Sequence, residues 1–123
     1  MHYRRIDIRD AEFLHGVVED IANKEGRLDG LLAAAGVQQE VPALEMTAKD
    51  ANTMMEINIT GTMMTAQAVA KQMIRFGNGG SMTFIASMSG TVANRVSSCD
   101  FISLATRAAG FEILLQLRVR QVI

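Results

Sequence analysis

Apolar positions in the first 36 residues show two patterns, the short runs of strands and the spacing of one helical face. Residues 3–8 form a short, partly alternating run, which predicts a strand. Asp10 and Gly26 are the expected N-cap and stop of the helix that follows. Residues 28–36 form a short apolar run bounded by glycines, which predicts a strand buried on both faces. The helix is indicated by apolar residues at the spacing of one helical face, namely Phe13, Leu14, Val17, Val18 and Ile21.

A loop and a long helix are predicted next. Residues 37–46 contain the only proline of the chain and are expected to form the loop. Thr47 and Asp50 have the spacing of a capping box, with Asp in place of the usual Glu. The helical pattern that begins there continues to about Arg75, with Gly61 as a weak point inside it.

Three further segments complete the pattern. Residues 77–80 have the Gly and Asn content of a turn, residues 81–87 are strand-like, and residues 100–119 show helical spacing. The resulting order of strand, helix, strand, helix, strand, helix predicts an α/β fold with parallel strands. No internal repeat or linker interrupts this order, so residues 1–123 are expected to form one domain.

Composition and charge exclude several classes of protein. Twelve basic and thirteen acidic residues give a net charge of −1, without the basic patch that nucleic-acid binding requires. No apolar run approaches the length of about 18 residues that a membrane span needs, and the N-terminus has no signal-like apolar stretch. The single cysteine, Cys99, cannot form an internal disulfide, and no Cys/His cluster has metal-ligand spacing. We expect a soluble, cytoplasmic protein that binds no metal, nucleic acid or membrane.

Three segments carry candidate chemistry. The small residues of 31–36 would let a flat ligand approach the backbone, although tight packing alone also explains them. Asn58 has a poor helix propensity, so its side chain either bonds backbone or water, or simply lies in solvent. Ser87 and Ser89 follow an apolar strand, where ligands bind in open α/β sheets, and a serine-rich turn that only caps the strand is the alternative.

The order of these segments resembles the middle of a short-chain dehydrogenase/reductase. The resemblance rests on Asp7-Ile8, on GRLDGLLAAAG, on Glu56-Ile-Asn-Ile-Thr-Gly61 and on GGSMTFIASMSG, and it covers residues 3–95. It implies an incomplete Rossmann-like fragment, a doubly wound parallel sheet reduced to three strands and three helices. The phrase from Phe84 to Asn94 particularly resembles the fungal polyol and sugar dehydrogenases that act on mannitol, arabinitol, sorbose or xylulose.

By this resemblance, four residues belong to a site for NAD or NADP. Asp7 is the carboxylate that meets the adenine amino group, and Ile8 packs against the adenine ring. Ala34 and Gly36 lie in the turn beside the adenosine ribose, where the family usually has Asn-Ala-Gly. Ala34 thus replaces the family's asparagine in a contact that is made largely by backbone.

The resemblance also assigns catalytic roles to two residues. Asn58 corresponds to the asparagine that holds a water of a proton relay, and Ser87 to the serine that bonds the substrate carbonyl or hydroxyl. The family transfers hydride between a nicotinamide ring and the carbon of a small alcohol or carbonyl substrate, with a tyrosinate as the acid/base. Residues 1–123 are expected to be a partial NAD(P)-binding domain of such an oxidoreductase.

Two motifs of the family are absent from the 123 residues. No TGxxxGxG turn is present to seat the pyrophosphate, and no Tyr-x-x-x-Lys follows Ser87, because the only tyrosine is Tyr3. We therefore expect a truncated chain that is inactive alone. The alternative is a non-catalytic interaction protein that pairs with an intact relative through the helix over 48–75. A homo-oligomer formed through the same Met-rich helix is also expected.

The resemblance fades abruptly after Arg95. Gradual divergence would blur motifs along the whole chain, whereas here Asn58 and Ser87 stand beside a wholly different tail. A shifted reading frame or a misplaced splice junction after the Arg95 codon explains such a boundary. A replaced but foldable tail, with helical spacing in residues 96–123, is the alternative.

Overall fold

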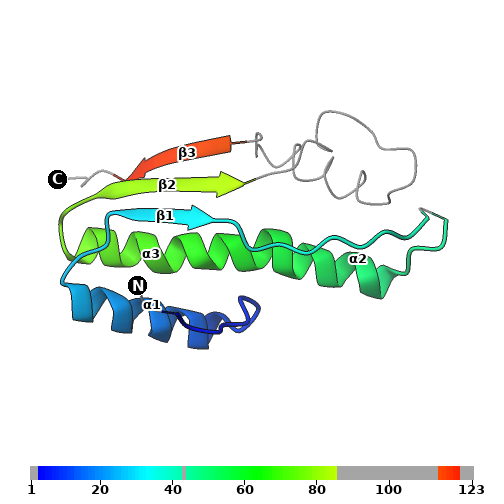
Figure 1. Ribbon diagram of the computed structural model, residues 1–123, viewed down its shortest axis with the longest axis horizontal. Helices are drawn as coiled ribbons and strands as arrows, with labels where there is room; N and C mark the ends of the chain where they lie inside the picture. Colours follow the sequence, from blue (N-terminus) through cyan, green and yellow to red (C-terminus); the bar gives the residue numbers. More distant parts are fainter. Residues whose placement is uncertain (1–2, 43, 86–113, 120–123) are drawn as a thin grey trace.

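The computed structural model describes residues 3–42, 44–85 and the backbone of 114–119. Its elements are, in chain order, α1 (Ala11–Glu25), β1 (Gly30–Ala33), α2 (Ala48–Met55), the π-helix η1 (Glu56–Gly61), α3 (Thr62–Arg75), β2 (Gly80–Ile85) and β3 (Leu114–Val119). The strands form one sheet in the order β1-β2-β3, and the helices lie along it (Figure 1). The predicted α/β class is therefore confirmed.

The ends of α1 confirm the sequence prediction. The Asp10 carboxylate accepts a hydrogen bond from the amide of Phe13, and Gly26 takes the left-handed conformation with φ of 74°. An N-cap oxygen satisfies one of the free amides of the first turn, and glycine enters the left-handed region without a Cβ penalty. The apolar stripe between these caps buries Leu14, Val17, Val18 and Ala22.

The predicted helix over 48–75 is also observed, as one continuous run of α2, η1 and α3. Thr47 caps it through its hydroxyl, which accepts the amide of Asp50. The run changes to π-helix between Glu56 and Gly61, and this change coincides with the glycine predicted as a weak point. Single π-turns within α-helices are rare and occur often at functional sites.

The sheet combines one parallel and one antiparallel pairing. β1 and β2 are parallel, with Leu31 opposite Met82 and Ala33 opposite Phe84. β3 runs antiparallel to β2, so its carboxyl end lies at the amino end of β2 (Figure 1). The long helical run of α2, η1 and α3 is the crossover connection that a parallel pair requires.

Two predicted elements are wrong. Residues 3–8 form no strand, because the Asp7 carboxylate accepts the amide of Arg9 and starts a tight turn. Residues 114–119, predicted as part of a helix, form β3. Their leucines fit helical spacing, but from Leu115 to Val119 apolar and polar residues alternate, which suits a strand beside the edge of β2. The rest of the predicted helix lies outside the described residues.

The core lies between one face of the sheet and the helices α1 and α3 (Figure 1). Met73 of α3 is fully buried and packs with Ala33, Met82 and Phe84 of the strands. The opposite face is uncovered within the described residues: Leu32 of β1 is 64% exposed. The expected burial of this strand on both faces is therefore wrong, because α1 and α3 lie on the same side of the sheet.

Candidate functional site

The predicted site residues that the structure describes gather at one end of the fold. β1 and β2 point their carboxyl ends to the same side, and the turn that precedes α1 lies toward that side as well (Figure 1). In open α/β sheets, ligands bind outside the carboxyl ends of the strands. The π-helix η1 contacts both the turn before α1 and the loop after β1, and it thereby joins them into one region.

Asn58 of η1 holds the loop that follows β1. Its Oδ1 accepts the Val37 amide at 2.8 Å, and its Nδ2 donates to the Val37 carbonyl at 2.9 Å. The side chain thus satisfies one donor and one acceptor of a loop residue that has no strand partner. From the sequence, the Asn58 side chain either forms hydrogen bonds with backbone or water or lies in solvent. The structure shows the first of these, with hydrogen bonds to the backbone of Val37.

Two glycines allow the close approaches in this region. A Cβ at Gly36 would lie 3.4 Å from Asn58 Oδ1. A Cβ at Gly61, three residues after Asn58 in η1, would lie 2.7 Å from Ile8 Cγ1. The structure therefore brings together Ile8, Gly36 and Asn58, three of the predicted site residues, through contacts on a single π-turn.

Asp7 presents an ionised carboxylate at the edge of the same region. Arg9 donates to it through Nε, through Nη2 at 2.6 Å and through its own amide. These hydrogen bonds stabilise the charged form and lower the pKa of Asp7 from 3.8 to about 2. The carboxylate is exposed, and its two oxygens together have about four lone-pair sites, so it can accept a further donor.

The loop after β1 is open to solvent. Ala34 and Gly36 are both exposed, so a flat ligand can reach their backbone. Ser87, the predicted substrate-binding residue, lies outside the described residues, as does Ser89.

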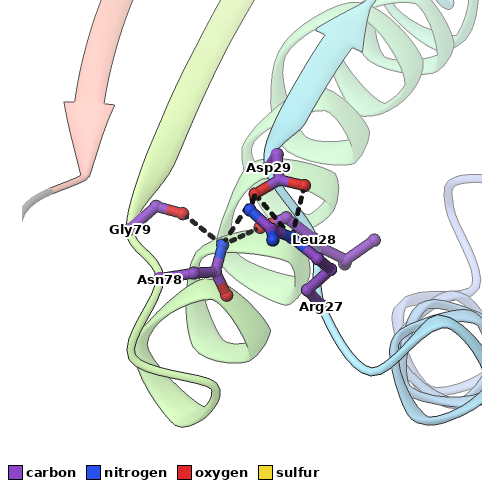
Figure 2. Close-up of polar contacts among 5 residues, drawn as sticks. All are labelled: Arg27, Leu28, Asp29, Asn78 and Gly79. Atoms are coloured by element: carbon purple, nitrogen blue, oxygen red, sulfur yellow. Dashed lines mark hydrogen bonds and ion pairs between the residues drawn. The ribbon is translucent and has the colours of Figure 1, made fainter.

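A second polar cluster lies at the opposite end of the strands and is structural. Asn78 donates to the carbonyls of Leu28 and Gly79, at 2.6 and 2.7 Å (Figure 2). Asn78 also reaches Asp29, which is paired with Arg27 at 2.6 Å. These bonds connect the turn before β2 to the residues before β1. The cluster therefore lies at the amino ends of the two strands.

Sequence reasoning missed three residues of the region. Arg9 and Val37 had no motif to mark them, although an arginine two residues after an aspartate could have suggested the ion pair. Gly61 was noticed only as a weak point in a helix, whereas it is the position on which Ile8 packs. Helical spacing could not show this, because the contact joins segments 53 positions apart along the sequence.

Neither a metal-ligand cluster nor a membrane-spanning helix is present in the described part of the chain. No three His, Cys, Asp or Glu side chains there are grouped as metal ligands would be. Among the same residues, no helix has the length and hydropathy to cross a bilayer.

Comparison with known proteins identifies relatives along most of the chain. The family described as short chain dehydrogenase matches residues 1–99. D-threitol dehydrogenase of Mycolicibacterium smegmatis is 37% identical over 87 residues, which is 71% of this chain and 33% of that protein. NADH-dependent L-xylulose reductase of Ambrosiozyma monospora is 36% identical over 90 residues, 72% of this chain and 33% of that protein. The chain thus spans about a third of the length of these relatives.

A solved structure shows the same fold. The short chain dehydrogenase from Mycobacterium paratuberculosis bound to NAD superimposes with a TM-score of 0.76 and 34% identity. The match covers 85% of this chain and 38% of that one.

Proposed function

The chain belongs to the short-chain dehydrogenase family, and from this membership we propose that it forms the adenosine side of an NAD(P) site in an oxidoreductase that acts on a polyol or sugar. The observation that carries the proposal is the joining of Ile8, Gly36 and Asn58 on η1, beside the ionised Asp7. The names of the threitol and xylulose relatives support the substrate class. We place the protein in the cytoplasm.

The residues present fit the adenosine part of such a cofactor. Asp7 offers an ionised acceptor for an exocyclic amino group, because Arg9 keeps its pKa at about 2. Ile8 offers an apolar surface against a purine ring, and the exposed backbone of Ala34 and Gly36 offers donors and acceptors to a ribose. When bound, the nicotinamide cofactor supplies hydride transfer to or from a carbon of the substrate.

The catalytic roles of Asn58 and Ser87 remain part of the proposal. The Asn58 side chain is engaged with Val37 through both its oxygen and its nitrogen, and we retain the relay water at this residue as part of the proposal. We assign Ser87 to the substrate oxygen. The 123 residues contain no Tyr-x-x-x-Lys, so we expect no turnover of NADH or NADPH with xylulose or ribulose by this chain alone.

Binding of the cofactor is therefore the decisive experiment. NAD+ affinity would be measured by saturation-transfer NMR for the wild-type chain, Asp7→Ala and Asp29→Ala. Asp29 is a matched control, since it is also an exposed carboxylate paired with an arginine two residues away, but at the opposite end of β1. We expect Asp7→Ala to weaken binding by about tenfold, the loss of one charge-assisted hydrogen bond, and Asp29→Ala to leave it unchanged. Equal effects of the two variants would refute the site.

A second function rests on the outer surface of the long helix. Met63 and Ile74 of α3 are 55% and 57% exposed, and apolar side chains at such positions suit a protein interface. The alternative is a non-catalytic protein that pairs with an intact relative through residues 48–75. Co-purification with a full-length relative, lost in a Met63→Glu/Ile74→Glu variant that still binds NAD+, would favour it.

A further inference from the structure

Gly61 lies where the turn before α1 meets η1, and it is buried. A Cβ at this position would be 2.7 and 2.8 Å from Ile8 Cγ1 and Cδ1, and 3.1 Å from the Ile8 carbonyl oxygen. Carbon atoms at van der Waals contact are about 3.5–4.0 Å apart. Even one methyl group on residue 61 would therefore require Ile8 to move.

Ile8 cannot simply turn away from such a methyl group. Its β-branched side chain has few χ1 rotamers, and its backbone oxygen belongs to a turn with little freedom. The Asp10 amide donates to the Asp7 carbonyl at 3.1 Å, and Arg9 binds the Asp7 carboxylate. Displacement at Ile8 would consequently move Asp7 with it.

The other half of the region is held by the same π-turn. Asn58, three residues before Gly61, fixes the backbone of Val37 through two hydrogen bonds. The distance between the Asp7 turn and the loop after β1 is thus set by η1. The Asn58 side chain holds the loop, and the missing side chain of Gly61 leaves room for the turn.

We propose that Gly61 is a positioning residue, whose missing side chain sets the depth of the Asp7–Ile8 turn and thereby the ability of the site to select a purine that carries an amino group. This inference rests on the proposed NAD(P) site and adds to it the residue that controls base selection. Gly61 acts through Ile8 and is not expected to touch the ligand.

The test compares two nucleotides that differ at one group. Adenosine 5′-monophosphate carries the amino donor for Asp7, and inosine 5′-monophosphate has a carbonyl oxygen there. Dissociation constants for both would be measured by NMR titration of the wild-type chain, Gly61→Ala, Ile8→Ala and the double variant. We expect the wild-type chain to prefer the adenine nucleotide by about tenfold, and Gly61→Ala to reduce this ratio to about one.

The double variant shows whether the effect passes through Ile8. Ile8→Ala removes the two carbons at 2.7 and 2.8 Å and leaves only the carbonyl oxygen at 3.1 Å, so the nucleotide ratio of the double variant should lie close to that of Ile8→Ala. This comparison also holds if Gly61→Ala itself does not fold. Gly16→Ala, where a Cβ meets nothing within 4 Å, controls for adding a methyl group to a helix.

The outcomes separate this inference from the proposed site. If the wild-type chain does not distinguish the two nucleotides, the adenosine site is wrong and the role of Gly61 falls with it. If the wild-type chain distinguishes them and Gly61→Ala does so equally well, only the role of Gly61 is overturned. A folded double variant whose ratio falls below that of Ile8→Ala by as large a factor as Gly61→Ala falls below the wild-type chain would likewise overturn it.

Discussion

Asp7 and Arg9 form an ion pair within one turn of the chain, and its electrostatics can be measured directly. The three donors of Arg9 favour the carboxylate form and lower the pKa of Asp7 from its ordinary value of 3.8 to about 2 in the folded chain. A depressed folded pKa contributes stability above the unfolded value. That contribution is fully present above about pH 4 and is lost as the pH falls through about 2.

Arg9→Gln should return the pKa of Asp7 toward 3.8, because it removes the charge and the guanidinium donors. The carboxyl carbon shift of Asp7, followed by NMR from neutral pH to the lowest pH at which the chain stays folded, measures this. Asp29, whose pKa Arg27 lowers, should titrate identically in both proteins. An unchanged titration of Asp7 in Arg9→Gln would contradict the assigned cause.

Replacement by alanine is expected to have opposite effects on the stability of the chain at two of its glycines. A Cβ at Gly80 would lie 2.6 Å from the Met73 side chain and 2.8 Å from the Asp29 carbonyl oxygen. Gly80→Ala should therefore destabilise the chain by about 1–3 kcal/mol, as overpacking of a core does. Gly16→Ala in α1 should stabilise it by about 0.5–1 kcal/mol through helix propensity. Urea unfolding measures both, and a neutral Gly80→Ala would show that β2 and α3 pack less closely than described.

At the scale of elements, η1 is the segment that gives the site its geometry. It interrupts a helix that the sequence predicted well at both ends, from the Thr47 cap to Arg75. The sequence marked Gly61 as a weak point, but it could not predict the π-helical geometry, since the contacts with Ile8 and Val37 are made by segments distant in sequence.

Asn58→Ala should loosen the loop after β1, because both polar groups of Val37 lose their partner. We expect faster hydrogen exchange at the Val37 amide and a loss of about 1–2 kcal/mol of stability, for two hydrogen bonds of ordinary strength. Asn52→Ala, at an exposed position of α2, is the matched control. Exchange at Val37 that is equal in both variants would show that the loop does not depend on Asn58.

The elements that sequence reasoning predicted correctly are those with local signals. α1 carries its stop in Gly26, and β2 follows a Gly-Asn-Gly turn in which Gly77 and Gly79 have positive φ. Residues 3–8 and 114–119 have weaker patterns, and side-chain bonds or the neighbouring strand decide their structure. The local pattern of apolar and polar residues contains no information on side-chain hydrogen bonds or on a neighbouring strand.

At the scale of the whole molecule, the chain carries about a third of the length of its relatives and leaves apolar surface uncovered. Leu32 is open to solvent on the sheet face that the helices do not cover, and Met63 and Ile74 are open on α3. The motifs allowed the family to be predicted from sequence, and the cofactor-side residues stay a prediction. The sequence could not show that Asn58 is engaged with Val37, because a motif names residues without their partners.

The exposed residues of α3 lead us to expect self-association of the chain through this helix. Sedimentation velocity at tens of micromolar should detect a dimer, and Met63→Glu/Ile74→Glu should weaken it by more than tenfold by placing charges in an apolar contact. Leu44→Glu, at a fully exposed loop position, controls for added charge. A compact monomer at all concentrations would contradict this expectation.

The central claim is that the loops held by η1 form the nucleoside side of an NAD(P) site. Chemical-shift mapping of the isotope-labelled chain with NAD+ tests it most directly. We predict shifts at residues 7–10, at Gly36 and Val37 and along Glu56–Gly61, with none at Asp29 or Asn78 at the other end of the strands. Shifts concentrated at Asp29 and Asn78, or no shifts up to the solubility limit of NAD+, would contradict it.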